Sequence, residues 1–161
     1  MKKITLQPVG IIHSPFKRTE DTPIQPTAAK GVKGSIEIYS KFVEGLKDLD
    51  GFSHLILLYY FHLIKNFKLK VRPFLDNKLH GVFSTRAPAR PNSIGFSIVE
   101  LIEIKENILF IQDVDIVDST PLLDIKPYVP QFDYREAVKA GWLKSNLDKL
   151  EDTRDDGRFI E

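Results

Sequence analysis

The chain has 161 residues, of which 42% are hydrophobic and 28% are charged. This composition is typical of a globular protein, and the length predicts one domain with a sizeable core. The formal net charge of +1 excludes nucleic-acid binding by bulk positive charge, so any such binding must use local patches. The absence of cysteine excludes disulfides, thiolate catalysis and zinc–thiolate sites, and it fits a reducing compartment.

No leader and no membrane span are expected from the sequence. The first residues are followed by polar residues and a proline, not by the apolar run of about 7–15 residues that signal peptides carry. The longest apolar run, residues 55–61, is far shorter than the roughly 20 residues that span a bilayer. We therefore expect a cytoplasmic protein without a membrane partner.

Short apolar segments separated by turn residues predict a mainly β protein. Strands are expected at residues 9–12, 34–39, 53–61, 96–104 and 108–117. The last two would form a hairpin, and residues 53–61, apolar on both faces, would be a central strand. Residues 17–30 hold prolines and threonines but almost no bulky apolar residue, which predicts a long loop of a functional or disordered kind. A basic strand face is expected from Lys68, Lys70 and Arg72.

Helical periodicity is limited to a short turn at residues 41–49 and to residues 135–153, and the charged tail 152–161 is expected to fray. Together these elements predict a mainly β, single-domain β-barrel of about seven strands with short helices, one near the C-terminus. Residues 5–130 would form the barrel, and residues 131–161 a helical extension that packs on the same domain. No Gly-x-Gly-x-x-Gly follows a strand and no Gly-Lys-Ser/Thr phosphate loop occurs, which argues against a Rossmann nucleotide site.

The segment GVFSTRAPARPNSIG (residues 81–95) places two arginines four residues apart among prolines. Proline fixes its own φ and keeps the preceding residue out of the helical region, so this segment is expected to be extended. Arg86 and Arg90 would point to one side of a strand, or diverge by about a third of a turn in a polyproline helix. Their guanidinium groups suit phosphate or carboxylate ligands. The alternative is a surface loop whose arginines pair with nearby acids.

A second set of polar residues occupies residues 113–128, where a predicted strand ends. On a strand, Asp113 and Asp115 would share a face, and Asp118 would follow the strand end. Such carboxylates could bind a metal, ribose hydroxyls or a cationic group, or could form ordinary turns by accepting backbone N–H bonds. Val117 breaks the calcium-loop pattern, so no metal is expected. We favour a functional role for Asp115 and Asp118, whereas both interpretations stay open for Asp113.

Of the four histidines, only His62 is a candidate for a site, because it follows the central strand at the rim of the predicted barrel. His13 and His80 are interpreted as strand-edge or loop residues, and His54 as a core histidine. Their spacing does not fit a metal site.

Four segments of the sequence together resemble the TsaA-like (TrmO) family of S-adenosylmethionine-dependent tRNA methyltransferases. They are the segment 81–95 above, DIVDSTPLLDIKPY at 115–128, GFSH at 51–54 and SPF at 14–16. The resemblance covers roughly residues 5–130. It implies a β-barrel methyltransferase unlike the Rossmann type, working as a homodimer with S-adenosyl-L-methionine near the interface. The implied substrate is threonylcarbamoyl-adenosine beside the anticodon of tRNA, methylated on its exocyclic nitrogen.

The resemblance also implies a set of site residues. The cofactor-binding residues that it carries over are Pro23, Ile24, Gln25, Phe61, His62, Arg86, Phe96, Asp115, Ile116, Val117 and Asp118. Small residues depart from the family pattern at Ala87, Ser93 and Ser119, and leave this cofactor site intact. Longer bacterial members carry an additional C-terminal domain, which leaves the identity of the acceptor open for this sequence.

The chemistry expected of these residues is methyl transfer by positioning. Phe61 and Phe96 would pack on the adenine or the sulfonium, and Asp118 would hold ribose hydroxyls or the ammonium group. For the acceptor side we predict an arginine for phosphate or carboxylate and a tyrosine for base stacking. The predicted substrate-binding residues are Arg90, Asn92, Lys126 and Tyr128, and the predicted catalytic residues are Asp118, Lys126 and Tyr128.

Two other functions stay open at this stage. One is a metal-dependent phosphoesterase that uses Asp113, Asp115, Asp118 and Asp124. The other is a non-catalytic barrel that binds RNA or a nucleotide without turnover, with an affinity that falls steeply with salt.

Overall fold

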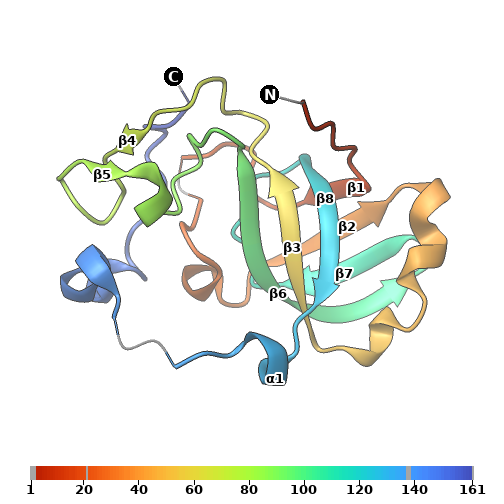
Figure 1. The fold of residues 1–161 in the computed structure, drawn as a ribbon. Coiled ribbons are helices and arrows are strands. Elements are labelled where there is room, and N and C mark those ends of the chain that lie inside the picture. Colours follow the sequence, from red (N-terminus) through yellow and green to blue (C-terminus); the bar gives the residue numbers. More distant parts are fainter. Residues whose placement is uncertain (1–2, 21, 137–138, 161) are drawn as a thin grey trace.

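A closed barrel of six antiparallel strands forms the body of the protein in the computed structural model, which describes residues 3–20, 22–136 and 139–160 (Figure 1). The strands are β1 (Gly10–His13), β2 (Lys33–Ile38), β3 (His54–Tyr60), β6 (Ile94–Lys105), β7 (Ile108–Gln112) and β8 (Thr120–Pro127). Their order around the barrel is β1-β2-β7-β6-β3-β8, and pairing between β8 and β1 closes it. The predicted β-barrel is confirmed, with six strands in the barrel instead of about seven.

The barrel interior is filled by alternate residues of each strand, because successive side chains of a strand point to opposite faces. Along β3, Leu55 and Leu57 are fully buried, whereas Ile56 and Leu58 are only partly buried. The same alternation supplies inward-facing residues from the other strands, which are Ile12, Ile36, Val99, Leu109, Ile111 and Leu122. The β6–β7 hairpin turns at Glu106, which has a positive φ of 55°. The interior is therefore a packed core, and a ligand has to bind at an end of the barrel.

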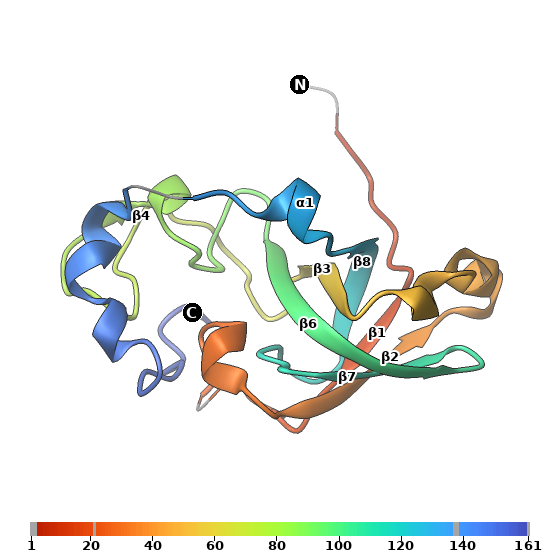
Figure 2. The ribbon, with the colours of Figure 1, turned by 90° about the horizontal axis from the view of Figure 1, so that it is seen from below.

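A second, smaller hydrophobic cluster lies beside the barrel. It contains Ile64, Val71, Val82, Ala87, Ala89 and Phe159. Figures 1 and 2 both show residues 61–93 and 139–160 on the same side of the barrel, although they are far apart in the sequence. A short pair of strands, β4 (Lys70–Val71) and β5 (His80–Gly81), belongs to this region. Of the three residues of the predicted basic strand face, Lys68, Lys70 and Arg72, only Lys70 lies in a strand.

Helices are short throughout the described residues, and most are 3-10 turns. They are η1 (Pro26–Ala29), η2 (Ser40–Leu46), η3 (Leu49–Gly51), η4 (Val82–Ser84), α1 (Pro130–Asp133), η5 (Gly141–Ser145) and η6 (Leu147–Lys149). None of them is long and apolar enough to cross a membrane. The prediction of a continuous helix over residues 135–153 is wrong: residues 135, 136, 139 and 140 are not helical, and Gly141 has a φ of +57°. Residues 137–138, also in that prediction, lie outside the described residues.

The C-terminal segment contacts the second cluster at several points. The indole Nε1 of Trp142 donates to the carbonyl of Ser84 (2.8 Å), and its ring stacks on His80 with centroids 4.6 Å apart. Phe159 is 8% exposed and packs edge-on against Phe74. The prediction that residues 152–161 fray is wrong for this segment, because Asp155 and Arg158 bond to Thr22 and Pro73 and Phe159 is buried. Residue 161, also in that prediction, lies outside the described residues.

Candidate functional site

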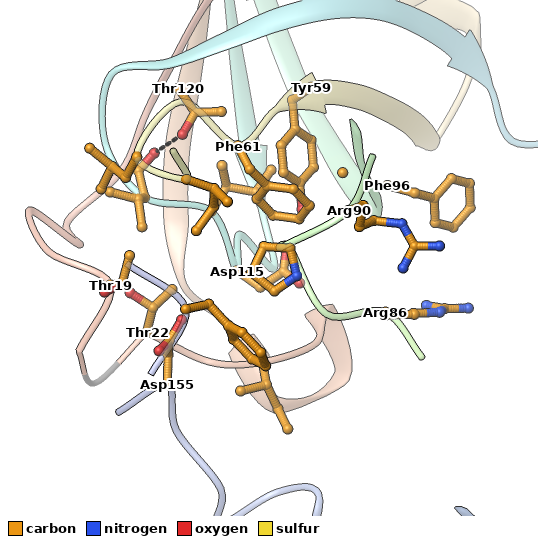
Figure 3. Close-up of a pocket in the computed structure, with 18 of the residues that line it drawn as sticks. Thr19, Thr22, Tyr59, Phe61, Arg86, Arg90, Phe96, Asp115, Thr120 and Asp155 are labelled. Atoms are coloured by element: carbon orange, nitrogen blue, oxygen red, sulfur yellow. Dashed lines mark hydrogen bonds between the residues drawn. The ribbon is translucent and has the colours of Figure 1, made fainter. Parts of the chain in front are cut away.

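A cavity of about 390 Å³ opens at the end of the barrel where β3 ends and β6 begins (Figure 3). Its walls come from separate parts of the chain: the loop 19–25, residues 59–64, residues 85–96, the β7–β8 connection at 115–120 and the C-terminal residues 155–160. Ligand cavities of small molecules typically measure about 300–1,000 Å³. The long loop that the sequence analysis singled out is thus one wall of this cavity.

Two residues that line the cavity, Tyr59 and Asp115, are joined by hydrogen bonds through the buried Ser97. The Ser97 hydroxyl donates to Oδ1 of Asp115 (2.7 Å), and the Tyr59 hydroxyl lies 3.0 Å from Ser97 Oγ. Since the Ser97 proton points to the carboxylate, the Tyr59 hydroxyl is the donor to Ser97. Burial raises the pKa of Asp115 to about 7, and burial together with the charge of Asp115 raises the pKa of Tyr59. Asp115 can therefore change its protonation state near neutral pH.

Tyr59 can lie in this position because its partner across the β3–β6 pair is Gly95. A Cβ on Gly95 would come within 2.1–2.7 Å of the Tyr59 ring carbons. The Phe61 ring packs edge-on against Tyr59, with centroids 5.4 Å apart. The glycine thus makes room for the aromatic wall of the cavity.

Arg86 lies at the rim of the cavity, opposite this aromatic wall. Its Nη1 donates to Oε1 of Gln25 (2.8 Å), and its guanidinium carbon lies 5.7 Å from the centre of the Phe96 ring. The charge of Arg86 also lowers the pKa of Asp115, although burial outweighs this effect. The rim therefore offers an exposed cation beside an exposed aromatic face.

His62 lines the same cavity after the end of β3. Burial lowers the pKa of His62 below its ordinary value of 6.5, so the ring is neutral at pH 7. Its Nδ1 lies 3.5 Å from Oγ1 of Thr120, whose hydroxyl donates to the carbonyl of Val117 (2.6 Å). These contacts join the end of β3 to the β7–β8 connection.

Most of the cofactor residues implied by the sequence resemblance are brought together by the fold. Those that line the cavity are Pro23, Ile24, Gln25, Phe61, His62, Arg86, Phe96, Asp115, Ile116 and Val117. Asp118 is not among the lining residues. Its carboxylate accepts from the backbone N of Ser14 (3.0 Å) and from Nζ of Lys17 (2.8 Å). Partial burial acts to raise the pKa of Asp118, but the bonds from Lys17 and Ser14 outweigh it and lower the pKa to about 2.

Arg90 differs from Arg86, although both were expected to present their guanidiniums to a ligand. Nη1 of Arg90 donates to three backbone carbonyls of its own loop, those of Val82 (3.2 Å), Thr85 (2.8 Å) and Ala87 (3.3 Å). Arg90 lines the cavity but also holds the loop in shape. Asn92 is exposed and lines a second groove outside this cavity.

Lys126 and Tyr128 lie towards the opposite end of the barrel. Along β8, Lys126 is six residues from Thr120, which corresponds to about 20 Å at the rise of a strand. Nζ of Lys126 pairs with Asp124 (2.7 Å). The Tyr128 backbone N donates to the His54 carbonyl (3.0 Å). The structure therefore does not bring the predicted catalytic residues Asp118, Lys126 and Tyr128 together.

The four acids of the phosphoesterase hypothesis also point to different partners. The strand β7 ends at Gln112, because Asp113 takes a left-handed φ of +67°. The expectation that Asp113 and Asp115 share a strand face is therefore wrong. Asp113 accepts from the backbone N of Gly31 (2.7 Å), and Asp124 pairs with a lysine. Within the described ranges, no three histidine or acidic side chains are grouped so as to hold a metal ion. The geometry does not support that hypothesis.

Several residues that line the cavity, or bond to its lining as Ser97 does, were missed from the sequence. Tyr59 and Ser97 lie at inward-facing strand positions, and a polar residue at such a position in an apolar strand is a signal that could have been used. Asp155 and Phe159 lie in a charged tail and gave no signal, because only the folded chain brings that tail to the cavity.

The profile of the tRNA-methyltransferase O N-terminal domain matches residues 11–134. A Pyrococcus abyssi protein named "Probable S-adenosyl-L-methionine-binding protein" is 60% identical over 157 residues, which cover 98% of this chain and 85% of that protein. The tRNA (adenine(37)-N6)-methyltransferase of Escherichia coli is 36% identical over 155 residues, covering 90% of this chain and 66% of the relative. A crystal structure of TrmO from Pseudomonas aeruginosa matches with a TM-score of 0.73 and 36% identity, over 88% of this chain and 63% of that chain.

The chain thus spans most of the archaeal relative and slightly less than two thirds of the two bacterial proteins. The matched region holds the barrel strands β2 to β8, the loop 19–25 and the arginine segment. The C-terminal residues at the cavity lie beyond it. Because the profile covers most of the chain and these relatives exceed 30% identity, the chain belongs to the TrmO (TsaA-like) family of S-adenosylmethionine-dependent tRNA methyltransferases.

Proposed function

We propose that the cavity binds S-adenosyl-L-methionine and that the protein methylates the exocyclic nitrogen of threonylcarbamoyl-adenosine beside the tRNA anticodon. The observation that carries this proposal is the convergence of aromatic, carboxylate and guanidinium side chains on one cavity of about 390 Å³. The relatives named as an S-adenosyl-L-methionine-binding protein and as a tRNA (adenine(37)-N6)-methyltransferase support the cofactor and the acceptor base.

The lining of the cavity fits this cofactor. S-adenosyl-L-methionine supplies a methyl group activated by a positively charged sulfonium. Phe61 and Phe96 offer apolar rings for the adenine and π faces for a cation. Asp115 and Asp155 place carboxylates on the walls, and Arg86 places a guanidinium at the rim. The residues proposed to hold the cofactor are Pro23, Ile24, Gln25, Phe61, His62, Arg86, Phe96, Asp115, Ile116 and Val117.

Asp115 is proposed to accept the proton that the exocyclic nitrogen loses. A general base works best when its pKa is near the working pH, and burial raises the pKa of Asp115 to about 7. The hydrogen bond from Ser97 orients Oδ1 and leaves Oδ2 to receive the proton. The two oxygens of Asp118, which the sequence predicts as a catalytic carboxylate, already accept from Ser14 and Lys17.

The acceptor side is proposed to extend from the cavity over the surface. Arg90 and Asn92 lie at or near the rim, where they are placed to contact the nucleotide or its neighbours. Lys126 and Tyr128, at the other end of β8, are proposed to contact the tRNA away from the reacting atoms. Their removal should weaken tRNA binding without changing cofactor affinity.

A homodimer is proposed as the working form. A second groove next to the cavity is lined by Ile4, Leu6 and Phe67, which are 82%, 58% and 57% exposed. Ile94 and Arg90 line both the groove and the cavity. A partner chain covering this groove would bury apolar surface and approach the cofactor.

The proposed compartment is the cytoplasm. The proposed substrate, tRNA, is present there, and the absence of cysteine fits a reducing compartment, in which disulfides do not form.

The test is a calorimetric titration with S-adenosyl-L-methionine followed by a methyl-transfer assay. We expect saturable binding that is weakened in Arg86→Ala, and transfer only to tRNA that carries threonylcarbamoyl-adenosine. Absence of binding at millimolar cofactor would refute the proposal. Salt-sensitive tRNA binding without cofactor binding or turnover would instead identify a non-catalytic RNA-binding barrel.

A further inference from the structure

The C-terminal residues 153–160 form a wall of the cavity, although the sequence alone predicts a frayed tail there. Arg154 forms a bridge with Pro23 in the loop 19–25, and the backbone N of Asp155 donates to the carbonyl of Thr22 (2.9 Å). These contacts attach the tail to the loop on which three proposed cofactor residues lie. Asp155, Phe159 and Ile160 then line the cavity itself.

The tail is also fixed on its far side. Nη1 of Arg158 donates to the carbonyl of Pro73 (3.1 Å), and Phe159 is buried in the second hydrophobic cluster. Gly157 has a φ of +80°, a conformation that side chains other than glycine rarely adopt, so the chain turns sharply between Asp155 and Phe159. The position of Asp155 is therefore fixed by contacts on both sides, to Thr22 on one side and through Phe159 to the second hydrophobic cluster on the other.

Among the described acids of this wall, Asp155 differs from Glu20 and Asp156 in forming no ion pair. Glu20 pairs with Arg18, and Asp156 pairs with Arg158. Oδ1 of Asp155 accepts from the backbone N of Gly157 (2.7 Å), and within the described residues no cationic side chain forms an ion pair with it. Burial, with the neighbouring charges of Asp156 and Glu20, raises the pKa of Asp155 to about 6, and outweighs the bond from Gly157 and the charge of Arg158, which act to lower it. A carboxylate of this kind gains most from a ligand that brings a positive charge.

We propose that Asp155 binds the cofactor by accepting a hydrogen bond from the α-ammonium group of S-adenosyl-L-methionine. The proposal rests on the cofactor assignment above and extends the site into a segment that the family profile does not cover. Figure 3 shows Asp155 beside Thr19 and Thr22, well away from Arg86 at the rim. A zwitterionic amino-acid group on this wall brings a cation to a carboxylate that forms no ion pair with the described residues. A ribose hydroxyl brings no charge and leaves that carboxylate without an ion pair.

The experiment compares three proteins by calorimetry with three ligands at pH 7.5. Asp155→Asn removes the charge but keeps an oxygen that can accept from Gly157. Asp152→Asn is the matched control, since Asp152 is an exposed acid close by in the sequence and does not line the cavity. The second ligand, 5′-methylthioadenosine, keeps the adenine and ribose but lacks the amino-acid group and the sulfonium charge. S-adenosylhomocysteine, which keeps the ammonium group without a sulfonium charge, is the control ligand and should follow S-adenosyl-L-methionine. We expect Asp155→Asn to weaken the binding of S-adenosyl-L-methionine at least tenfold and to leave the affinity for 5′-methylthioadenosine within twofold, with the affinities of Asp152→Asn unchanged.

The other outcomes separate this proposal from the function on which it rests. If Asp155→Asn weakened the binding of S-adenosyl-L-methionine and of 5′-methylthioadenosine equally, the ammonium contact would be refuted and the ribose would be placed at Asp155. Unchanged affinity for S-adenosyl-L-methionine in Asp155→Asn would overturn the proposal while the cofactor assignment stands. If wild-type protein bound none of the ligands, both would be refuted. A second variant, Asp155→Ser, removes the same charge and must reproduce the result if Asp155→Asn unfolds, as judged by its melting temperature.

Discussion

Two aspartates three residues apart, Asp115 and Asp118, lie on opposite sides of the β7–β8 connection and have opposite properties. On the inner side, Asp115 faces the cavity, accepts from Ser97, and has a pKa raised to about 7. On the outer side, Asp118 accepts from Lys17 and Ser14 and has a pKa lowered to about 2. The sequence motif assigns both aspartates to the same cofactor site. Their burial and their charged neighbours decide which of the two carboxylates can exchange a proton near neutral pH.

The largest expected effect is on turnover at the inner aspartate. Asp115→Asn keeps an oxygen that can accept from Ser97 but removes the basic carboxylate. We expect the methyl-transfer rate to fall by about 10²–10⁴-fold, the range typical of losing a general base. The measurement is single-turnover transfer to modified tRNA, with Asp118→Asn as the matched control. A comparable loss of the transfer rate in Asp118→Asn would contradict the assignment of the general base to Asp115 alone.

The aromatic wall behind the inner aspartate should be nearly as sensitive. Gly95→Ala places a Cβ about 2.1 Å from a ring carbon of Tyr59, so the ring has to move and its bond to Ser97 is disturbed. We expect a loss of about 1–3 kcal/mol of unfolding free energy, as is usual for overpacking, together with weaker cofactor binding. Chemical denaturation and calorimetry would measure the two effects. Gly45→Ala, where an added Cβ meets no atom within 4 Å, is the control.

Protonation of Asp115 should also change stability with pH. Its folded pKa of about 7 lies above the ordinary value of 3.8, so the folded state holds the proton more tightly and stability falls as pH rises from about 4 to 7. Asp115→Asn should therefore match the wild type near pH 4 and be about 1–3 kcal/mol more stable above pH 7. Denaturation midpoints at pH 4, 6 and 8 would show this. A constant difference at all three would mean that the carboxyl is not protonated in the folded state.

The smallest effect is expected on the outer side, with the opposite sign. The pKa of Asp118 is lowered from 3.8 to about 2, so its contribution to stability is present above pH 4 and is lost between about pH 4 and 2. Asp118→Asn should cost about 1–2 kcal/mol at pH 7 and should leave cofactor affinity within twofold. Thermal unfolding and cofactor titration would measure both. A large loss of cofactor affinity would return Asp118 to the cofactor site implied by the family pattern.

Much of the barrel could be predicted from the sequence. Period-two alternation marked β2, and an apolar run marked β3, because one side of each strand must face the interior. The hairpin between β6 and β7 was marked by a turn at residues 105–107. The family resemblance added the cofactor residues Pro23 to Gln25 and the rim arginine, Arg86, all of which line the cavity. These features depend on local patterns or on motifs within single segments.

The sequence by itself therefore determined the β-barrel class, the family and part of the lining of the cavity. Only the tertiary structure decided that Asp115 faces the cavity while Asp118 faces Lys17, because one left-handed residue, Asp113, ends β7 and changes the direction of the chain. It also decided that Arg90 holds its own loop and that Asp155 reaches the cavity from the end of the chain. Burial and counter-charge depend on residues distant in sequence, and these set the chemistry of each carboxylate.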